Sequence, residues 1–347
     1  MSTSIFESEI YEQPDVLSRF LKESLDRVRE IAKHLQKHEP KFVLVAARGT
    51  SDNAAIYAKY LISAYLRIPV GLAIPSLYTL YHQPPLMRQT LVIGISQSGA
   101  SPDVLAVMEE ARNQKSPTLA ILNRLDAPMA EHADLIIPLG CGEERAVAAS
   151  KTHTAQLLSI ASLVALWAES PTMIEELNPV PDYLRFVLSS PDQVRAIAEQ
   201  IKDHNRILVV GRGFTHCTTH EIALKIKELS YVSADPYSAA DFMHGPIALV
   251  EEGFPLIAIA PKGKTVNSMK ELVNEVDRIG AETIVISNDE ELINTHSKAI
   301  PLPRDLPEWL APIVAVVPGQ LLALFLTLAR GNDPDQPRRL KKVTKTL

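Results

Sequence analysis

A run of hydroxyl side chains, Ser96-Gln97-Ser98-Gly99-Ala100-Ser101, directly follows the apolar run of residues 91–95. Pro102 then opens an apolar helical pattern, which predicts Ser101 as the helix N-cap and Pro102 as the first helical residue. Backbone amides and hydroxyls that converge on the positive end of a helix favour an anion. Because no lysine follows at the Walker spacing, a single phosphoryl group fits better than a nucleoside triphosphate. An ordinary Ser/Gly turn before a capped helix is the alternative interpretation.

A second group of polar side chains lies in the second half of the chain. Glu221, Lys225 and Glu228 are spaced by four and three residues, so they share one face of a predicted helix. His244 follows within the run of residues 241–246. A carboxylate beside a lysine and near a histidine is what proton transfer between adjacent carbons of a sugar requires. The alternative is a routine salt-bridge ladder on a solvated helix.

Two other motifs indicate neither a metal nor a cofactor. His216, Cys217 and His220 do not supply the four ligands of a closed zinc site, and we interpret them as polar residues at the start of a helix. Gly211-Arg212-Gly213 lacks the third glycine of a dinucleotide fingerprint. Neither motif therefore predicts a zinc site or a bound dinucleotide.

The elements that must position these residues occur twice. Residues 43–49 align with residues 207–213, and the same spacing places 91–95 on 255–259 and 119–122 on 283–286. Each run is continuously apolar and precedes an amphipathic segment of helix length, which is typical of parallel strands buried on both faces. The predicted fold is α/β, with two tandem doubly wound parallel sheets of the flavodoxin-like type. We predict domains at residues 1–170 and 193–347, with ligands beyond the carboxyl ends of the strands.

Helices are predicted around these sheets at residues 15–37, at 151–168, and from near Pro318. The uncharged stretch 311–329 approaches the length of a membrane span. Pro312, Pro318 and Gly319 interrupt it, which favours a core helix instead.

Composition limits the class of protein. The chain has 347 residues, about two domains, with 35 basic against 41 acidic side chains and 46% hydrophobic residues. This balance indicates a soluble protein and argues against duplex nucleic acid or a membrane as partner. Two cysteines, and a start that lacks the pattern of a secretory signal, favour the cytoplasm.

The chain resembles the tandem sugar isomerase (SIS) domain family, and it is closely similar to the isomerase half of the glutamine:fructose-6-phosphate amidotransferases. The resemblance covers nearly the whole chain. It rests on Glu9-Ile10-Tyr11-Glu12-Gln13-Pro14, Gly49-Thr50-Ser51, Ser96-Gln97-Ser98-Gly99, residues 223–228, His244-Gly245-Pro246 and residues 335–342.

The resemblance implies a site for a hexose 6-phosphate. The residues that would hold the phosphate are Ser96, Gln97, Ser98 and Ser101, and those near the sugar are Arg48, Gly49, Thr50, Ser51 and Val147. It also implies that Glu228 moves a proton between carbons 1 and 2, that His244 assists ring opening, and that Lys342 reaches the open-chain carbonyl, with Lys225 beside them. In the family the histidine loop enters the neighbouring subunit, so we expect a homodimer. The resemblance also implies that no metal and no organic cofactor is needed, so we expect neither.

Two departures from the family pattern bear on the substrate. Ser2 stands where the glutaminase half would supply its cysteine nucleophile, so we expect no ammonia to be generated in place. Arg48 and Ala149 replace a cysteine and a serine of the family near the sugar. We therefore expect a glucosamine 6-phosphate deaminase, as stand-alone relatives are, that releases ammonia and fructose 6-phosphate.

Three alternatives stay open: an ammonia-dependent glucosamine 6-phosphate synthase, a deaminase or deglycase of another amino-sugar phosphate, and a sugar-phosphate sensor without turnover. A sensor would need the serine loop alone.

Overall fold

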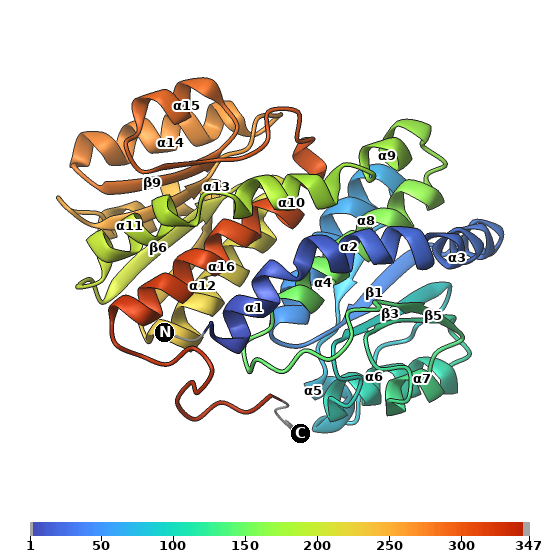
Figure 1. The fold of residues 1–347 in the computed structure, drawn as a ribbon. Helices are drawn as coiled ribbons and strands as arrows, with labels where there is room; N and C mark the ends of the chain where they lie inside the picture. The colour runs from blue at the N-terminus through green and yellow to red at the C-terminus, as the bar shows by residue number, and fades with distance from the viewer. Residues whose placement is uncertain (1–2, 343–347) are drawn as a thin grey trace. The chain divides into compact units, whose positions relative to one another are not determined.

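The computed structural model describes residues 3–342, which form two compact units (Figure 1). The first unit contains residues 15–144, 151–178 and 341–342, and the second contains residues 3–14, 145–150 and 179–340. The sequence predicts contiguous domains, 1–170 and 193–347. In the structure, residues 3–14 belong to the second unit and residues 341–342 belong to the first. The start of the chain joins the second unit because the Asp335 carboxylate accepts hydrogen bonds from the amides of Ile5 and Phe6, at 2.8 and 3.0 Å.

The first unit is built on a parallel sheet in the order β2-β1-β3-β4-β5. Its strands are β1 (Phe42–Ala46), β2 (Val70–Leu72), β3 (Thr90–Ser96), β4 (Thr118–Leu122) and β5 (Leu135–Pro138). Its helices are α2 (Gln13–Glu23), α3 (Leu25–His38), α4 (Thr50–Leu61), α5 (Ser76–Thr79), α6 (Pro102–Asn113), α7 (Pro128–Glu131), α8 (Lys151–Trp167) and α9 (Pro171–Glu176), with a π-helical turn at Ile62–Leu66. Side chains of β3 and β4 pack with those of α6 in one buried cluster.

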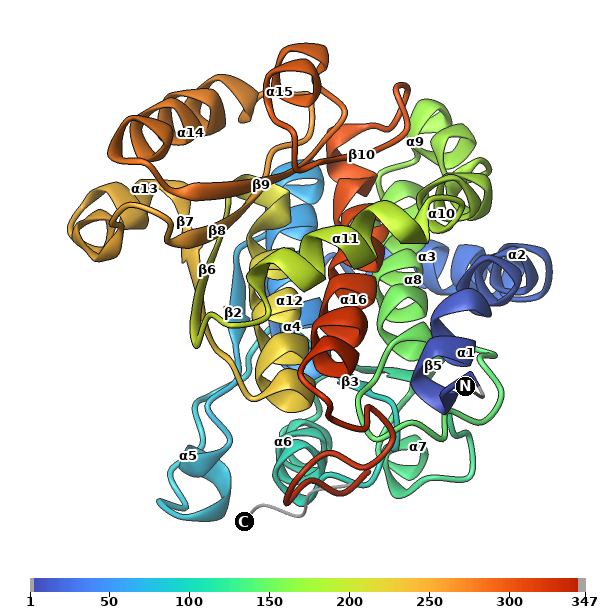
Figure 2. The same ribbon diagram turned by 60° about the vertical axis from the view of Figure 1, so that its left-hand side comes forward.

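The second unit repeats this plan, with a parallel sheet in the order β10-β9-β8-β6-β7 (Figure 2). Its strands are β6 (Arg206–Gly211), β7 (Ser233–Ser238), β8 (Pro255–Ile259), β9 (Glu282–Ser287) and β10 (Ala299–Pro301). Its α-helices are α1 (Ile5–Tyr11), α10 (Val180–Leu188), α11 (Pro191–Ile201), α12 (His216–Ser230), α13 (Ala239–Met243), α14 (Val266–Ile279), α15 (Glu290–Thr295) and α16 (Ala311–Ala329). Short 3-10 turns lie at Gly213–Thr215, Pro246–Leu249 and Glu308–Leu310.

The two sheets have the same topology. Counted within each unit, both follow the order 2-1-3-4-5, the flavodoxin-like arrangement. Strands β3, β4 and β8 are buried at every residue, as continuous apolar runs predict for strands covered on both faces. The predicted tandem α/β fold is confirmed.

The uncharged stretch is a core helix, but the prediction of where it starts is wrong. α16 begins at Ala311. Pro312 does not prevent this start, because it lies in the first turn, where a missing N–H is tolerated. Pro318 lies inside the helix. At the next residue, a Cβ on Gly319 would come within 2.3 Å of Ile222 on α12, so the two helices are closely packed there. In the described part of the chain it is the single helix long and apolar enough to cross a membrane, and its most apolar 18-residue window is buried in the protein.

The predicted helix of residues 15–37 is two helices, α2 and α3, which are separated at Ser24.

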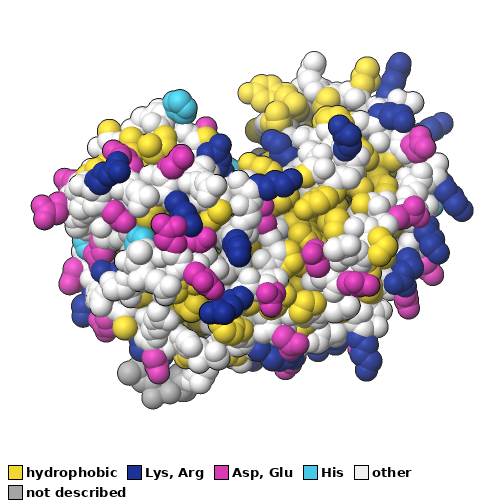
Figure 3. All heavy atoms as spheres, turned by 90° about the horizontal axis from the view of Figure 1, so that it is seen from above, with side chains coloured by type: hydrophobic (Ala, Val, Ile, Leu, Met, Phe, Trp, Pro, Cys, Tyr) yellow, Lys and Arg dark blue, Asp and Glu magenta, His cyan; other side chains and the backbone are white. Residues whose placement is uncertain are grey.

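On the face shown in Figure 3, Lys and Arg side chains alternate with Asp and Glu side chains. The residues in view thus form no basic patch of the kind that nucleic acid phosphates select.

Candidate active site

The loops after β1 and β3 lie next to each other at the carboxyl edge of the first sheet, because Ala46 pairs with Gly94. An ion pair between Arg48 and Asp103 connects them. The Asp103 carboxylate is buried and also accepts hydrogen bonds from Ser101 Oγ at 2.9 Å and from the Val104 amide at 3.0 Å. The Arg48 guanidinium therefore offsets a negative charge that would otherwise face an anion at the start of α6.

The serine loop has the predicted form. Ser101 is the N-cap of α6 and Pro102 is its first residue. The hydroxyl of Ser96 accepts a hydrogen bond from the Gly99 amide at 2.9 Å, and Ser98 Oγ accepts one from Ala100 at 3.4 Å. Gly99 is required here, because its φ is +61° and a Cβ would lie 2.6 Å from the Cβ of Ala127. The side chains of Gln97, Ser98 and Ser101 are half-buried and remain accessible.

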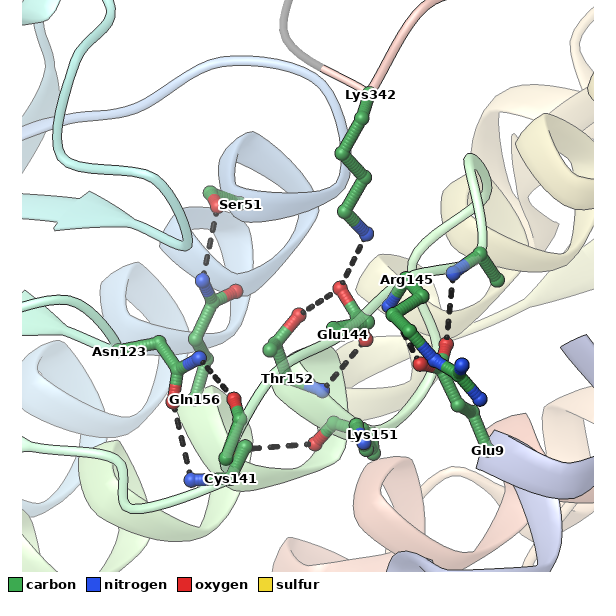
Figure 4. Close-up of polar contacts among 12 residues, drawn as sticks. Glu9, Ser51, Asn123, Cys141, Glu144, Arg145, Lys151, Thr152, Gln156 and Lys342 are labelled. Carbon is green, nitrogen blue, oxygen red and sulfur yellow. Dashed lines mark hydrogen bonds and ion pairs between the residues drawn. The ribbon is translucent and has the colours of Figure 1, made fainter. Parts of the chain in front are cut away.

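The neighbouring loop brings further hydroxyls to the same edge. Gly49 precedes α4 with φ 55° and ψ −130°, a conformation that only glycine adopts readily. Thr50 is the first residue of α4, and the buried Ser51 accepts a hydrogen bond from Gln156 Nε2 on α8 at 2.9 Å (Figure 4). Burial raises the pKa of Asp52 in the same turn, and the nearby Arg48 opposes this shift.

Lys342 lies in the same unit, against a buried carboxylate. Its Nζ is 2.9 Å from Glu144 Oε2, and Glu144 also accepts hydrogen bonds from the amide and hydroxyl of Thr152 (Figure 4). The sequence analysis did not single out Glu144, which stands in an irregular loop and belongs to no periodic pattern.

In the second unit, α12 carries the predicted Glu-Lys-Glu face. Lys225 Nζ lies 2.5 Å from Glu228 Oε2 and 3.4 Å from Glu221 Oε1. The side chains of Lys225 and Glu221 are 1% and 0% exposed, whereas that of Glu228 is 24% exposed. A solvated ladder is therefore excluded. The cluster has one carboxylate that solvent can reach, Glu228, beside a buried ammonium.

Two other predicted residues belong to this unit. His244 follows α13 with an exposed side chain, and its amide donates to the Asp241 carbonyl at 3.1 Å. Val147 is half-buried in the segment 145–150. Glu9 holds this segment, since its carboxylate accepts the amides of Arg145 and Ala146 at 2.6 and 3.2 Å.

His216, Cys217 and His220 form the first turns of α12, as predicted. The two imidazole rings meet edge to face with centroids 4.8 Å apart. Burial lowers the pKa of His220 to about 4, and His216 adds to the shift. Burial raises the pKa of Cys217 to about 12. Within residues 3–342, no three His, Cys, Asp or Glu side chains gather in a way that could hold a metal ion.

The loop after β8 is the counterpart of the serine loop, and a carboxylate of the same chain occupies it. Glu308 accepts hydrogen bonds from the Lys264 amide at 2.8 Å, the Thr265 amide at 3.1 Å and the Thr265 hydroxyl at 2.8 Å. A Cβ on Gly263 would lie 2.4 Å from Glu308 Cδ. The second copy therefore binds an internal anion where the first copy presents hydroxyls.

The predicted site residues thus fall into two sets. The first unit contains Arg48, Gly49, Thr50, Ser51, Ser96, Gln97, Ser98, Ser101 and Lys342, and the second contains Val147, Lys225, Glu228 and His244.

Comparisons with known proteins agree with this architecture. The model of the family described as "SIS domain" matches residues 38–166 and 200–329. A glutamine–fructose-6-phosphate aminotransferase (isomerizing) of Thermococcus kodakarensis is 36% identical over 343 residues, which cover 96% of this chain and 56% of that protein. The chain thus spans little more than half the length of the curated relatives it matches.

Solved structures show the same fold. The C-terminal domain of glucosamine-fructose-6-phosphate aminotransferase from Francisella tularensis superposes with a TM-score of 0.89 at 28% identity, covering 97% of this chain and 99% of that one. Glucosamine-6-phosphate deaminase from Thermotoga maritima superposes with a TM-score of 0.81 at 24% identity, covering 99% and 100%. The second likeness concerns the fold alone.

Proposed function

This chain belongs to the SIS domain family, and on that premise we propose that it is a phosphosugar isomerase acting on a hexosamine 6-phosphate. The specific reaction we propose is the conversion of glucosamine 6-phosphate to fructose 6-phosphate and ammonia. The observation that carries the proposal is the cluster on α12, in which a carboxylate that solvent reaches is paired with a buried ammonium.

The phosphate would bind at the serine loop. Its hydroxyls and the amides at the start of α6 favour a doubly charged ester, and the Arg48–Asp103 ion pair keeps the nearby carboxylate from repelling it. The sugar would extend toward Thr50 and Ser51 of the neighbouring loop.

Glu228 would carry the proton. After ring opening, assisted by His244, Glu228 removes the proton from carbon 2 and returns it to carbon 1. A second proton passes from the amine nitrogen to the oxygen on carbon 1, so that the aldehyde becomes an alcohol and the amine becomes an imine. Water adds at carbon 2, ammonia leaves, and fructose 6-phosphate remains. The Lys225 ammonium donates a hydrogen bond to the Glu228 carboxylate and orients it, and Lys342 reaches the open-chain carbonyl. His244 is exposed on its loop, which suits a histidine that completes the site of a second copy in a homodimer.

Deamination is the direction that we propose for this reaction. Free ammonia is dilute and mostly protonated near neutral pH, so release is favoured over capture unless ammonia is delivered. The substrates named for the relatives, together with the expected cytoplasmic location, fit such a reaction in amino sugar metabolism.

A panel of phosphosugars tests the proposal. The chain as printed is incubated with glucosamine, galactosamine or fructosamine 6-phosphate, and separately with fructose 6-phosphate and ammonium, while ammonia and ketose are measured. We expect ammonia and fructose 6-phosphate from glucosamine 6-phosphate. If only another member of the panel is turned over, that sugar phosphate is the substrate instead of glucosamine 6-phosphate. If the protein binds panel members but turns none of them over, it is a sensor.

A further inference from the structure

We propose that Glu144 is a positioning residue, which fixes the Lys342 ammonium and thereby sets the register of the C-terminal tail. The proposal deepens the proposed function, because the role of Lys342 at the sugar carbonyl belongs to that function. The contact itself lies within the first unit and stands independently of the reaction.

The Glu144 carboxylate is fully buried and held at both oxygens. Oε1 accepts the Thr152 amide at 3.0 Å, and Oε2 accepts the Thr152 hydroxyl at 2.8 Å and the Lys342 ammonium at 2.9 Å (Figure 4). The amide belongs to the first turn of α8, where the helix macrodipole favours negative charge. The contacts with Thr152 thus hold the Glu144 carboxylate in place independently of Lys342.

A buried carboxylate strongly favours a counter-charge, since desolvation of an ion costs several kcal/mol unless a partner offsets it. The tail offers two consecutive lysines, Lys341 and Lys342. Lys341 is exposed, whereas Lys342 is 25% exposed with its Nζ on the carboxylate. Glu144 therefore selects one of two adjacent ammonium groups, and a shift of the tail by one residue would break the contact.

A labelling experiment without substrate tests the inference. Wild type, Glu144→Gln and Glu143→Gln are treated with limiting acetic anhydride, and the acetylation rate of each lysine is read by mass spectrometry. Lys341 is the internal reference on the same tail. Glu143 is the matched control, because it is the adjacent carboxylate and is exposed.

We expect Lys342 to react about tenfold more slowly than Lys341 in wild type and in Glu143→Gln, as a charge-assisted hydrogen bond predicts. In Glu144→Gln the two rates should become equal. Equal rates in wild type, or an unchanged ratio in Glu144→Gln, would overturn the proposal. If Glu144→Gln fails to fold by circular dichroism, Glu144→Asp replaces it, since the shorter side chain withdraws the charge from Nζ; the wild-type ratio needs no variant.

Turnover separates this inference from the proposed function. We expect Glu144→Gln to lower kcat with little change in KM, because the serine loop is untouched. In the background of Lys342→Met it should add nothing further, since both changes remove one interaction. Additive losses would overturn the positioning role. If the protein shows the expected labelling ratio but no turnover, the proposed function is refuted and the Glu144–Lys342 contact is supported.

Discussion

Replacement of Lys225 by methionine is the most direct test of the α12 cluster. Methionine has nearly the volume of the lysine stem, so the change removes the charge and leaves little cavity. The Lys225 side chain is 1% exposed and Glu221 is 0% exposed, with 3.4 Å between Nζ and Oε1. The variant thus deprives a fully buried carboxylate of its ammonium partner.

The expected cost follows from this burial. Removal of one partner from a buried ion pair typically costs about 3–5 kcal/mol, because the remaining charge stays desolvated. We expect the free energy of unfolding to fall by about 3 kcal/mol, a large fraction of the ~5–15 kcal/mol of an ordinary domain. The Lys225→Met/Glu221→Gln double variant should lose less, since it buries a neutral amide.

Urea denaturation at pH 7, followed by circular dichroism, measures these differences. Lys227→Met is the matched control, because Lys227 is exposed on the same helix and its loss should cost less than about 0.5 kcal/mol. A loss in Lys225→Met no larger than that of the control, or a double variant as unstable as the single one, would refute the description of the cluster as a buried ion pair.

Three further predictions concern the site and its surroundings. Glu228→Gln should bind hexosamine 6-phosphate by calorimetry with nearly unchanged affinity and lose turnover by about 10²- to 10⁴-fold; near-normal turnover would remove Glu228 as the proton carrier. Ser98→Ala should raise KM for the phosphorylated sugar roughly tenfold with kcat largely kept, because one hydroxyl contact to a charged group is lost; an unchanged KM would place the phosphate elsewhere. Burial lowers the pKa of His220 to about 4 against 6.5 for the unfolded chain, so the unfolded state binds more protons and stability falls as the pH drops from 6.5 toward 4. In urea titrations, His220→Gln should reduce the difference in the free energy of unfolding between pH 7 and pH 4.5 by roughly 1 kcal/mol, after allowance for the partial exposure of His220. The same difference in both proteins would contradict the burial argument.

The fold could be predicted because its main signal is local and occurs twice. A parallel strand covered on both faces must be continuously apolar, and β1, β3 and β4 share this pattern with β6, β8 and β9. The start of α16 could not be predicted, because the usual rule ends or kinks a helix before Pro318. α16 continues through Pro318, and the close packing of Gly319 on Ile222 of α12 is a tertiary contact that no local pattern records.

The local features of the candidate site were predictable, whereas the roles of its residues stay predictions. The N-cap at Ser101 and the spacing on α12 are visible in the sequence. The carboxylates that organise the site are not, because each acts through a distant partner. Asp103 pairs with Arg48 across 55 residues, and Glu144 pairs with Lys342 across 198. Only the fold brings such pairs together.

The two copies of the anion loop show how a duplicated fold can acquire a single site. Both loops lead from a central strand into an amphipathic helix, so both began with the same partial positive charge at the helix start. After β8, Glu308 satisfies the amides of Lys264 and Thr265, and as part of the same chain it pays no entropy of association. A phosphoryl group would have to displace it. The carboxylate at the start of α6, Asp103, is instead paired with Arg48. For that reason we expect one phosphoryl group per chain, bound at the serine loop.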